Sequence, residues 1–147
     1  MLELHSLSID YLSDIHKSIT GNVAEYFYDF KDIEETREWI TKAIIKHESG
    51  EKEEYVITDN EEFIGMISPN YPTPTVAEIG MWIAPTMQGK GYGKQSLELL
   101  FGLLQSKGIT KVFYSTDKNN LASINLATSL GFERMNEDEE IVFVKKI

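Results

Sequence analysis

The residues with the clearest chemical potential form a glycine-rich turn, Gln88-Gly89-Lys90-Gly91-Tyr92-Gly93, between a strand expected to end at Ala84 and a helix expected from Gly91. Its glycines remove side chains where a backbone must approach a ligand closely. The first N–H groups of a helix have no partner inside it, and the helix dipole is positive there. Lys90 and Lys94 add positive charge. The turn therefore predicts a site for an anion, most commonly a phosphate.

Two phosphate-binding motifs do not fit this turn. A P-loop requires Gly-x-x-x-x-Gly-Lys-Ser/Thr, and that spacing does not occur in the chain. In the dinucleotide motif Gly-x-Gly-x-x-Gly the third glycine falls one residue later than Gly93, and an acidic residue follows ~20 positions on, where this chain has Phe113. The alternative to a phosphate site is a glycine-rich helix start that binds nothing.

The elements around the turn predict an α/β (α+β) domain. Apolar residues recur at helical spacing, as in Leu97, Leu100, Phe101 and Leu104, and β-branched and aromatic runs indicate strands. The expected helices are 10–19, 32–49, 91–107 and 121–130. The expected strands are 2–7, 54–58, 62–68, 76–84, 111–116 and a final pair from 131 onward, with turns at 59–61 and in the Pro-rich segment 69–74. This order indicates a mixed sheet, and 147 residues is the usual size of one domain, here 1–147.

Composition narrows the function classes. The net charge is −10, which suits solubility or the attraction of a cationic substrate and disfavours nucleic-acid binding. The chain has no cysteine, so disulfides and a cysteine nucleophile are excluded. His5, His16 and His47 lack paired ligand spacing, so no metal is expected. Without a membrane-spanning apolar run or a secretory signal, we expect a cytoplasmic protein that does not bind membranes.

Three motifs resemble those of the Gcn5-related N-acetyltransferases (GNAT). Residues 88–93 match the family's Gln/Arg-x-x-Gly-x-Gly/Ala pyrophosphate motif, and residues 78–85 look like the strand that leads into it. Asn120-Leu121-Ala122-Ser123 and Leu130-Gly131-Phe132 are similar to its later Asn-x-x-Ser and Leu-Gly-Phe signatures. The strand and the Asn-x-x-Ser segment look closest to the branch that acetylates ribosomal-protein N-termini.

The resemblance implies a GNAT-like fold: a mixed, mostly antiparallel sheet of about seven strands, splayed at the cofactor cleft and flanked by about four helices. It implies a monomeric or homodimeric N-acetyltransferase that moves an acetyl group directly from acetyl-CoA to a primary amine, in a small molecule or at a protein N-terminus. The implied cofactor contacts run along the strand, the turn and the later helix: Met81, Trp82, Ile83, Gln88, Gly89, Lys90, Gly91, Tyr92, Gly93, Lys94, Asn120 and Ser123.

The catalytic groups are expected on the strand and the later helix. Glu78 shares a strand face with Gly80 and Trp82, so it is the predicted general base, directly or through water; its alternative is a solvent-facing glutamate. Many family members protonate the leaving thiolate with a tyrosine, but that position here is Ala127. The branch resemblance points instead to Ser123, for which helix capping is the alternative.

Acceptor recognition is expected between the first two helices. Residues 21–30 interleave four aromatics with two carboxylates, which suits an amine pocket or, alternatively, a short helix packed on the core. The run 137–140 is expected to be a solvated turn. Two other functions compete: a non-catalytic acyl-CoA-binding regulatory module, favoured only by Ala127, and a phosphate-binding domain unrelated to CoA.

Overall fold

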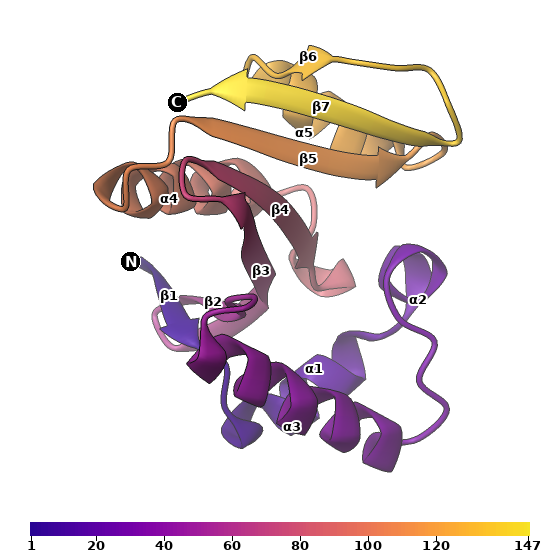
Figure 1. Cartoon of the computed structure of the whole chain (residues 1–147). Coiled ribbons are helices and arrows are strands. Elements are labelled where there is room, and N and C mark those ends of the chain that lie inside the picture. The colour runs from indigo at the N-terminus through magenta and orange to yellow at the C-terminus, as the bar shows by residue number, and fades with distance from the viewer.

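A seven-stranded sheet organises the computed structural model, which describes all 147 residues (Figure 1). The strand order is β1-β2-β3-β4-β5-β7-β6, and every neighbouring pair is antiparallel except β4 and β5. The strands are β1 Leu2–Ser6, β2 Tyr55–Asp59, β3 Glu62–Thr73, β4 Val76–Ile83, β5 Lys111–Asp117, β6 Glu133–Arg134 and β7 Glu140–Lys146. The fold class and strand number predicted from the sequence are confirmed.

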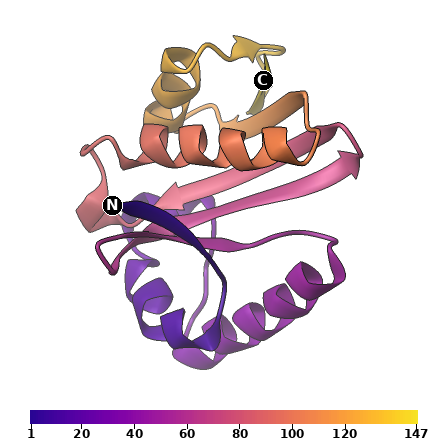
Figure 2. The same ribbon diagram turned by 90° about the vertical axis from the view of Figure 1, so that its left-hand side faces the viewer.

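Helices cover both faces of this sheet. They are α1 Leu12–Ser18, α2 Gly21–Tyr26, α3 Ile33–Ser49, α4 Tyr92–Ser106 and α5 Leu121–Ser129, with 3-10 turns at Ile9–Tyr11 and Pro85–Met87. Figure 2 shows α4 on one side of the β3–β4 hairpin and α1 and α3 on the other. Two buried apolar clusters follow from this arrangement. One includes Ile79, Met81 and Leu97, and the other includes Ile40, Met66 and Trp82.

The sheet opens between β4 and β5. These two strands pair in parallel only from Val76 opposite Lys111 to Ile79 opposite Tyr114. Beyond that point β4 continues to Ile83 beside β3 and β5 continues to Asp117 beside β7, but β4 and β5 no longer pair with each other. We call this divergence the fork. It places unpaired main-chain groups at the centre of the molecule, as the predicted splay requires.

Several predicted element boundaries are wrong. There are five α-helices where about four were expected, because residues 21–26 form α2. The Pro-rich turn is instead the end of β3, which runs through Pro69 and turns only after Thr73. Proline lacks an N–H group, and a residue's N–H and C=O point to the same side of a strand. The Pro69 carbonyl accepts from Glu53 N–H, beyond the last pair of the β2–β3 ladder, so the missing N–H costs that ladder no hydrogen bond.

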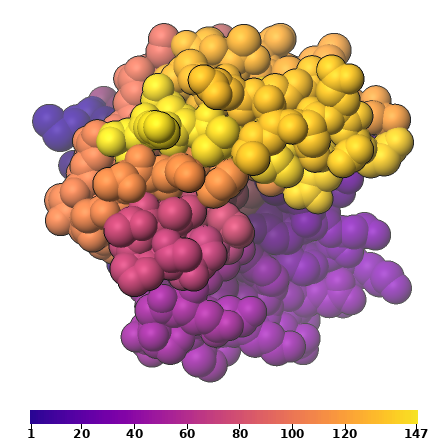
Figure 3. All heavy atoms as spheres, turned by 45° about the horizontal axis from the view of Figure 1, so that its top comes forward, coloured from indigo at the N-terminus to yellow at the C-terminus, as the bar shows by residue number.

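The N-terminal helices and the C-terminal strands lie at opposite ends of the molecule. Figure 3 shows the purple N-terminal residues below the yellow C-terminal ones, with the magenta residues near the β3–β4 hairpin between them on the left of the view. In Figure 1, α2 lies apart from α1 and α3, toward the end of β4 that faces the fork. Segments far apart in the sequence thus meet around the fork. No helix of the structure has both the length and the apolar composition to cross a membrane.

Candidate active site

The glycine turn forms an uncapped helix start. Gly89 and Gly91 have positive φ values of 76° and 85°, a conformation that favours glycine. Gly91 is the N-cap of α4, and no side chain caps the helix there. Gly93 has a different task, since an added Cβ would lie 3.1 Å from Leu126 Cδ2 and 3.4 Å from Met81 Cε. Two glycines therefore shape the backbone, and the third lets α4 pack against α5 and β4.

A cavity of about 280 Å³ runs along this turn. Of the cofactor-binding residues predicted from the sequence, all but Lys90 line it. Lys90 is exposed, with its Nζ 4.0 Å from Met87 Sδ. Seven further lining residues were not among the predicted cofactor contacts, and they come from α2, the turn, β5 and α5: Asn22, Val23, Phe27, Met87, Tyr114, Ala122 and Leu126.

The β4 main chain presents alternate residues to the fork. Ala84 N–H donates to Ile64 O on β3 at 2.8 Å, and Trp82 is paired with Met66 in the same register. Hydrogen-bonding directions alternate along a strand, so Trp82 faces β3 while Met81 and Ile83 face the fork. Of the three strand residues expected to contact the cofactor, Met81 and Ile83 thus present their main-chain groups to the fork, and Trp82 presents its main-chain groups to β3.

Gln88 joins the cofactor side to α2. Its Nε2 donates to Asn22 Oδ1 and to Ile83 O, both at 2.8 Å, and its Oε1 accepts from Asn22 Nδ2 at 3.2 Å. This reciprocal amide pair uses both polar ends of the Gln88 side chain. Gln88 therefore holds α2 against the turn, a role that the motif alone did not indicate.

A second cavity of about 480 Å³ adjoins the first. Its walls come from α2, β4, β5, the start of α5 and the β6–β7 loop: Tyr26, Phe27, Gly80, Met81, Tyr114, Ser115, Thr116, Asp117, Asn120, Ser123, Glu139 and Glu140. Three of these are carboxylates, of which Glu139 pairs with Lys118 at 2.7 Å. Asp117 and Glu140 are opposite each other on β5 and β7. This acidic cavity suits a cationic group.

The two cavities meet at the fork. They share five lining residues, from α2, β4, β5 and α5: Phe27, Met81, Tyr114, Asn120 and Ser123. Asn120 Oδ1 accepts from Ser123 N–H at 3.4 Å, so Asn120 is a helix cap as well as a cavity wall. Tyr114 donates its hydroxyl hydrogen to Ser123 Oγ at 3.3 Å. Groups bound in the two cavities can therefore come together beside Ser123.

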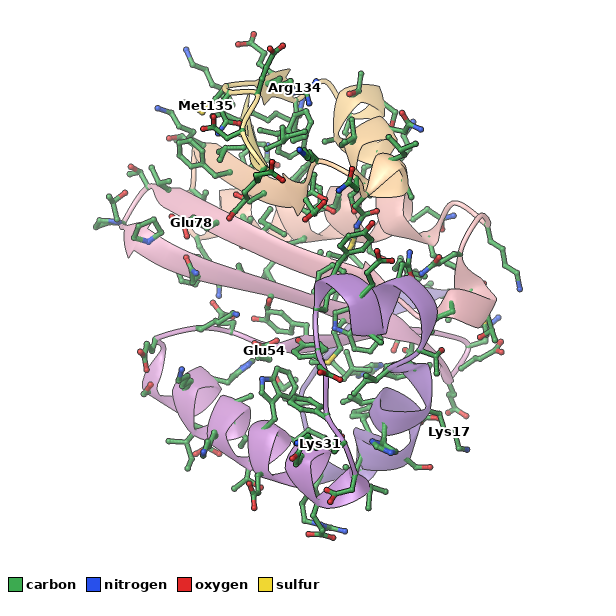
Figure 4. All side chains as sticks on the ribbon, turned by 90° about the vertical axis from the view of Figure 1, so that its right-hand side faces the viewer. Lys17, Lys31, Glu54, Glu78, Arg134 and Met135 are labelled. Atoms are coloured by element: carbon green, nitrogen blue, oxygen red, sulfur yellow. The ribbon has the colours of Figure 1, made fainter.

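Glu78 lines neither cavity. It is exposed and shares a strand face with Gly80, as its position in the sequence indicated. It pairs opposite Phe113, inside the closed part of the sheet and just before the fork. Figure 4 shows Glu78 on the sheet, to one side of α2. In this structure Glu78 therefore lies outside the walls of both cavities, two residues from Gly80 in the wall of the second.

The segment 21–30 contributes both to a cavity wall and to the core. Tyr26 and Phe27 line the acidic cavity. Tyr28 instead packs edge-on against Trp39 and Trp82, with ring centroids 4.9 and 6.2 Å away, and burial raises its pKa. The first half of the segment therefore forms a wall of the site, and the second half anchors that wall to the core.

The comparisons with known proteins identify the class. Residues 2–133 match the acetyltransferase (GNAT) domain family, so the chain belongs to the GNAT acetyltransferases. The predicted class, an acyltransferase with acetyl-CoA as cosubstrate, is confirmed.

Individual relatives resemble the chain to different extents. The ribosomal-protein-serine acetyltransferase of Escherichia coli K12 is 26% identical over 140 residues, 89% of this chain and 78% of that protein. The mycothiol acetyltransferase of Renibacterium salmoninarum is 41% identical over 56 residues, which span 38% of this chain and only 17% of that protein. RimL, a ribosomal α-N-protein acetyltransferase solved with coenzyme A, superposes with a TM-score of 0.87 at 23% identity and covers 99% of this chain and 94% of its own. The predicted resemblance to the ribosomal-protein branch is therefore confirmed.

Proposed function

We propose that this chain acetylates a primary amine, in a small molecule or at a protein N-terminus, with the amine bound in the acidic cavity. The observation that carries this proposal is the fork, where a cavity along the glycine turn meets a second, acidic one. Because the two cavities share five lining residues, both substrates can be bound at the same time. Direct transfer needs that arrangement, and the chain has no cysteine that would form an acyl-enzyme.

The glycine turn would hold the pyrophosphate of acetyl-CoA. The uncapped N–H groups at the start of α4 supply donors, and Lys94 lines the same cavity. Such a helix start binds anions through its free N–H groups and its dipole together. Lys90 would contribute charge from the rim. Asn120 and Ser123 would complete the groove from the side of α5.

Main-chain groups at the fork would stabilise the reaction. Met81 is the fork-facing residue nearest the last β4–β5 pair, so we assign its N–H to the thioester oxygen, where negative charge develops. A fixed donor aimed at that oxygen is worth about 10²–10³ in rate. The strand holds this N–H in place before the substrates bind, so little reorganisation is needed during the reaction.

The amine proton would leave through the acidic cavity. Asp117 and Glu140 line the cavity itself, whereas Glu78 lies outside its walls. An α-amine, with a pKa of ~7.7–8.0, loses its proton more easily than a lysine side chain at ~10.4. A protein N-terminus or a small α-amine therefore suits a site whose carboxylates are exposed.

An amine panel tests this function. The protein is incubated with acetyl-CoA and amino acids, polyamines, aminoglycosides or N-terminal peptides, and free thiol is measured, which the cysteine-free chain does not contribute. We expect acetyl-CoA binding and turnover with at least one α-amine. Binding without turnover across the panel would favour the regulatory module. No binding of acetyl-CoA would contradict the proposal.

A further inference from the structure

Tyr114 occupies the point where the sheet opens. It belongs to the last β4–β5 pair, is only 3% exposed and lines both cavities. Its hydroxyl donates to Ser123 Oγ at 3.3 Å. This distance is long for an O–H···O bond, but catalytic hydrogen bonds often shorten only when substrates bind. Tyr114 and Ser123 thus form a connected hydroxyl pair at the meeting point of the two cavities.

The helix side of the site lacks an acid of its own. The position that holds a tyrosine in the resembling family is Ala127, which is fully buried in the cluster that also contains Tyr114 and Phe132. Apart from the Tyr114–Ser123 pair, the residues common to both cavities are Phe27, Met81 and Asn120, and none of their side chains is an acid. Because Ser123 has a single hydroxyl proton, a serine that gives it away needs a second donor behind it.

We propose that Tyr114 supplies this second donor: it is a positioning residue that holds Ser123 Oγ and replaces the proton that Ser123 passes to the leaving thiolate. The proposal rests on the proposed function, since it assigns the acid for the same transfer. Tyr114 on β5 would then take over the role of the tyrosine that α5 lacks, since its hydroxyl lies beside Ser123 where the two cavities meet.

The proton transfers balance. The amine nitrogen forms a bond to the thioester carbon, and the C–S bond breaks with its electron pair on sulfur. Sulfur takes the proton of Ser123 Oγ, and Ser123 takes the proton of Tyr114. The ammonium loses its first proton through the acidic cavity before the attack, and water carries the second proton, released by the nitrogen after the attack, back to Tyr114. The products are the amide and a free thiol, and both hydroxyls are restored.

Burial raises both the pKa of the Tyr114 phenol and that of the thiol formed at the fork. Desolvation raises the pKa of Tyr114, an effect partly opposed by the hydrogen bond to Ser123, so the phenol stays protonated and able to donate. The same apolar surroundings raise the basicity of a thiolate formed at the fork, because burial disfavours either anion. The pair therefore remains capable of proton transfer although a free phenol, at about 10, is a weaker acid than an alkyl thiol at about 8.5.

The first test needs no acceptor. The protein lacks cysteine, so the thiol of bound CoA is the only one in the sample, and its ionisation can be followed by ultraviolet absorbance or by alkylation rate against pH. A hydrogen bond donated by Ser123 to sulfur favours the thiolate, and Tyr114 supports that bond. Tyr114→Phe should therefore raise the pKa of the thiol of bound CoA by about one unit. Ser123→Ala should raise it at least as much, and the double variant no further. The control Tyr55→Phe, which loses a hydroxyl bonded to Glu53 outside both cavities, should leave it unchanged.

Turnover gives the second test, with the best acceptor of the panel. Tyr114→Phe keeps the ring that packs 6.1 Å from Phe132 and should lower kcat about tenfold to a hundredfold, with KM for acetyl-CoA within about twofold. Should that variant not fold, the single-turnover rate of the wild-type protein is measured in H₂O–D₂O mixtures instead. Because two protons move, we expect this rate to depend on the deuterium fraction of the solvent along a curve. If the wild-type protein turns over and Tyr114→Phe changes neither kcat nor the pKa of the CoA thiol, this inference alone is overturned. A rate that depends linearly on the deuterium fraction would overturn it as well. A wild-type protein that binds no CoA would instead contradict the proposed function.

Discussion

The cavity along the glycine turn and the acidic cavity are built in different ways. Ten of the 18 residues that line the first come from one continuous stretch, residues 81–94, and α2, β5 and α5 supply the rest. The walls of the second come from α2, β4, β5, α5 and the β6–β7 loop, which only the folded sheet brings together. The proposed cofactor site is therefore more local in sequence than the proposed acceptor site, which is distributed over the chain.

This difference bears on specificity. A local motif binds a ligand through main-chain groups, so it tolerates many side-chain changes as long as its glycines remain. The distributed cavity draws its charge from side chains at the end of β5, in the β6–β7 loop and at the start of β7. In this molecule the acceptor side carries Asp117, Glu139 and Glu140, and the cofactor side carries Lys90 and Lys94. Each cavity thus has the charge that suits its proposed ligand.

The largest effect is expected when the local motif is broken. Gly91→Glu places a side chain at a φ of +85° and a negative charge beside the pyrophosphate site, so acetyl-CoA affinity should fall at least about 100-fold. Isothermal titration calorimetry measures this loss. The control Gly102→Glu puts the same charge on α4, where an added Cβ meets nothing within 4 Å, and should bind normally. Unchanged affinity in Gly91→Glu would remove the turn from the site.

A smaller effect is expected on the acceptor side. Asp117→Asn keeps the side-chain oxygen that accepts from Asn119 N–H at 2.8 Å but removes the charge, so kcat/KM for the amine should fall about tenfold. Acetyl-CoA affinity should stay within about twofold. Glu78→Gln, outside the cavity, should change kcat/KM by less than about threefold.

Steady-state kinetics of both variants with one amine decide which carboxylate serves the amine. A larger loss in Glu78→Gln than in Asp117→Asn would restore Glu78 as the base predicted from its strand position.

The smallest effect is expected where the two cavities are joined. Asn22→Ala removes the amide pair with Gln88, worth about 1 kcal/mol, so the KM values for acetyl-CoA and for the amine should both rise about two- to fivefold. The exposed amide Gln105, far along α4, gives the control Gln105→Ala. A rise in only one KM would show that α2 serves one cavity rather than both.

Sequence reasoning was most successful where function depends on neighbours in the chain. The turn, the strand before it and the helix after it were predicted nearly to the residue, and all but one of the predicted cofactor residues line the cavity. Glu78 was predicted from strand alternation, which correctly indicates its face. Alternation does not indicate where β4 and β5 separate, and that position leaves Glu78 outside both cavities.

The sequence by itself determined the glycine turn, the family and most of the element order, because backbone conformation at the glycines and hydrophobic periodicity are local properties. Only the tertiary structure decided which residues meet at the fork. Tyr114, Asn22 and Asp117 are brought there by the parallel pairing of β4 with β5, the packing of α2 and the return of β7. Such contacts depend on how distant segments share one sheet, which no spacing along the chain specifies.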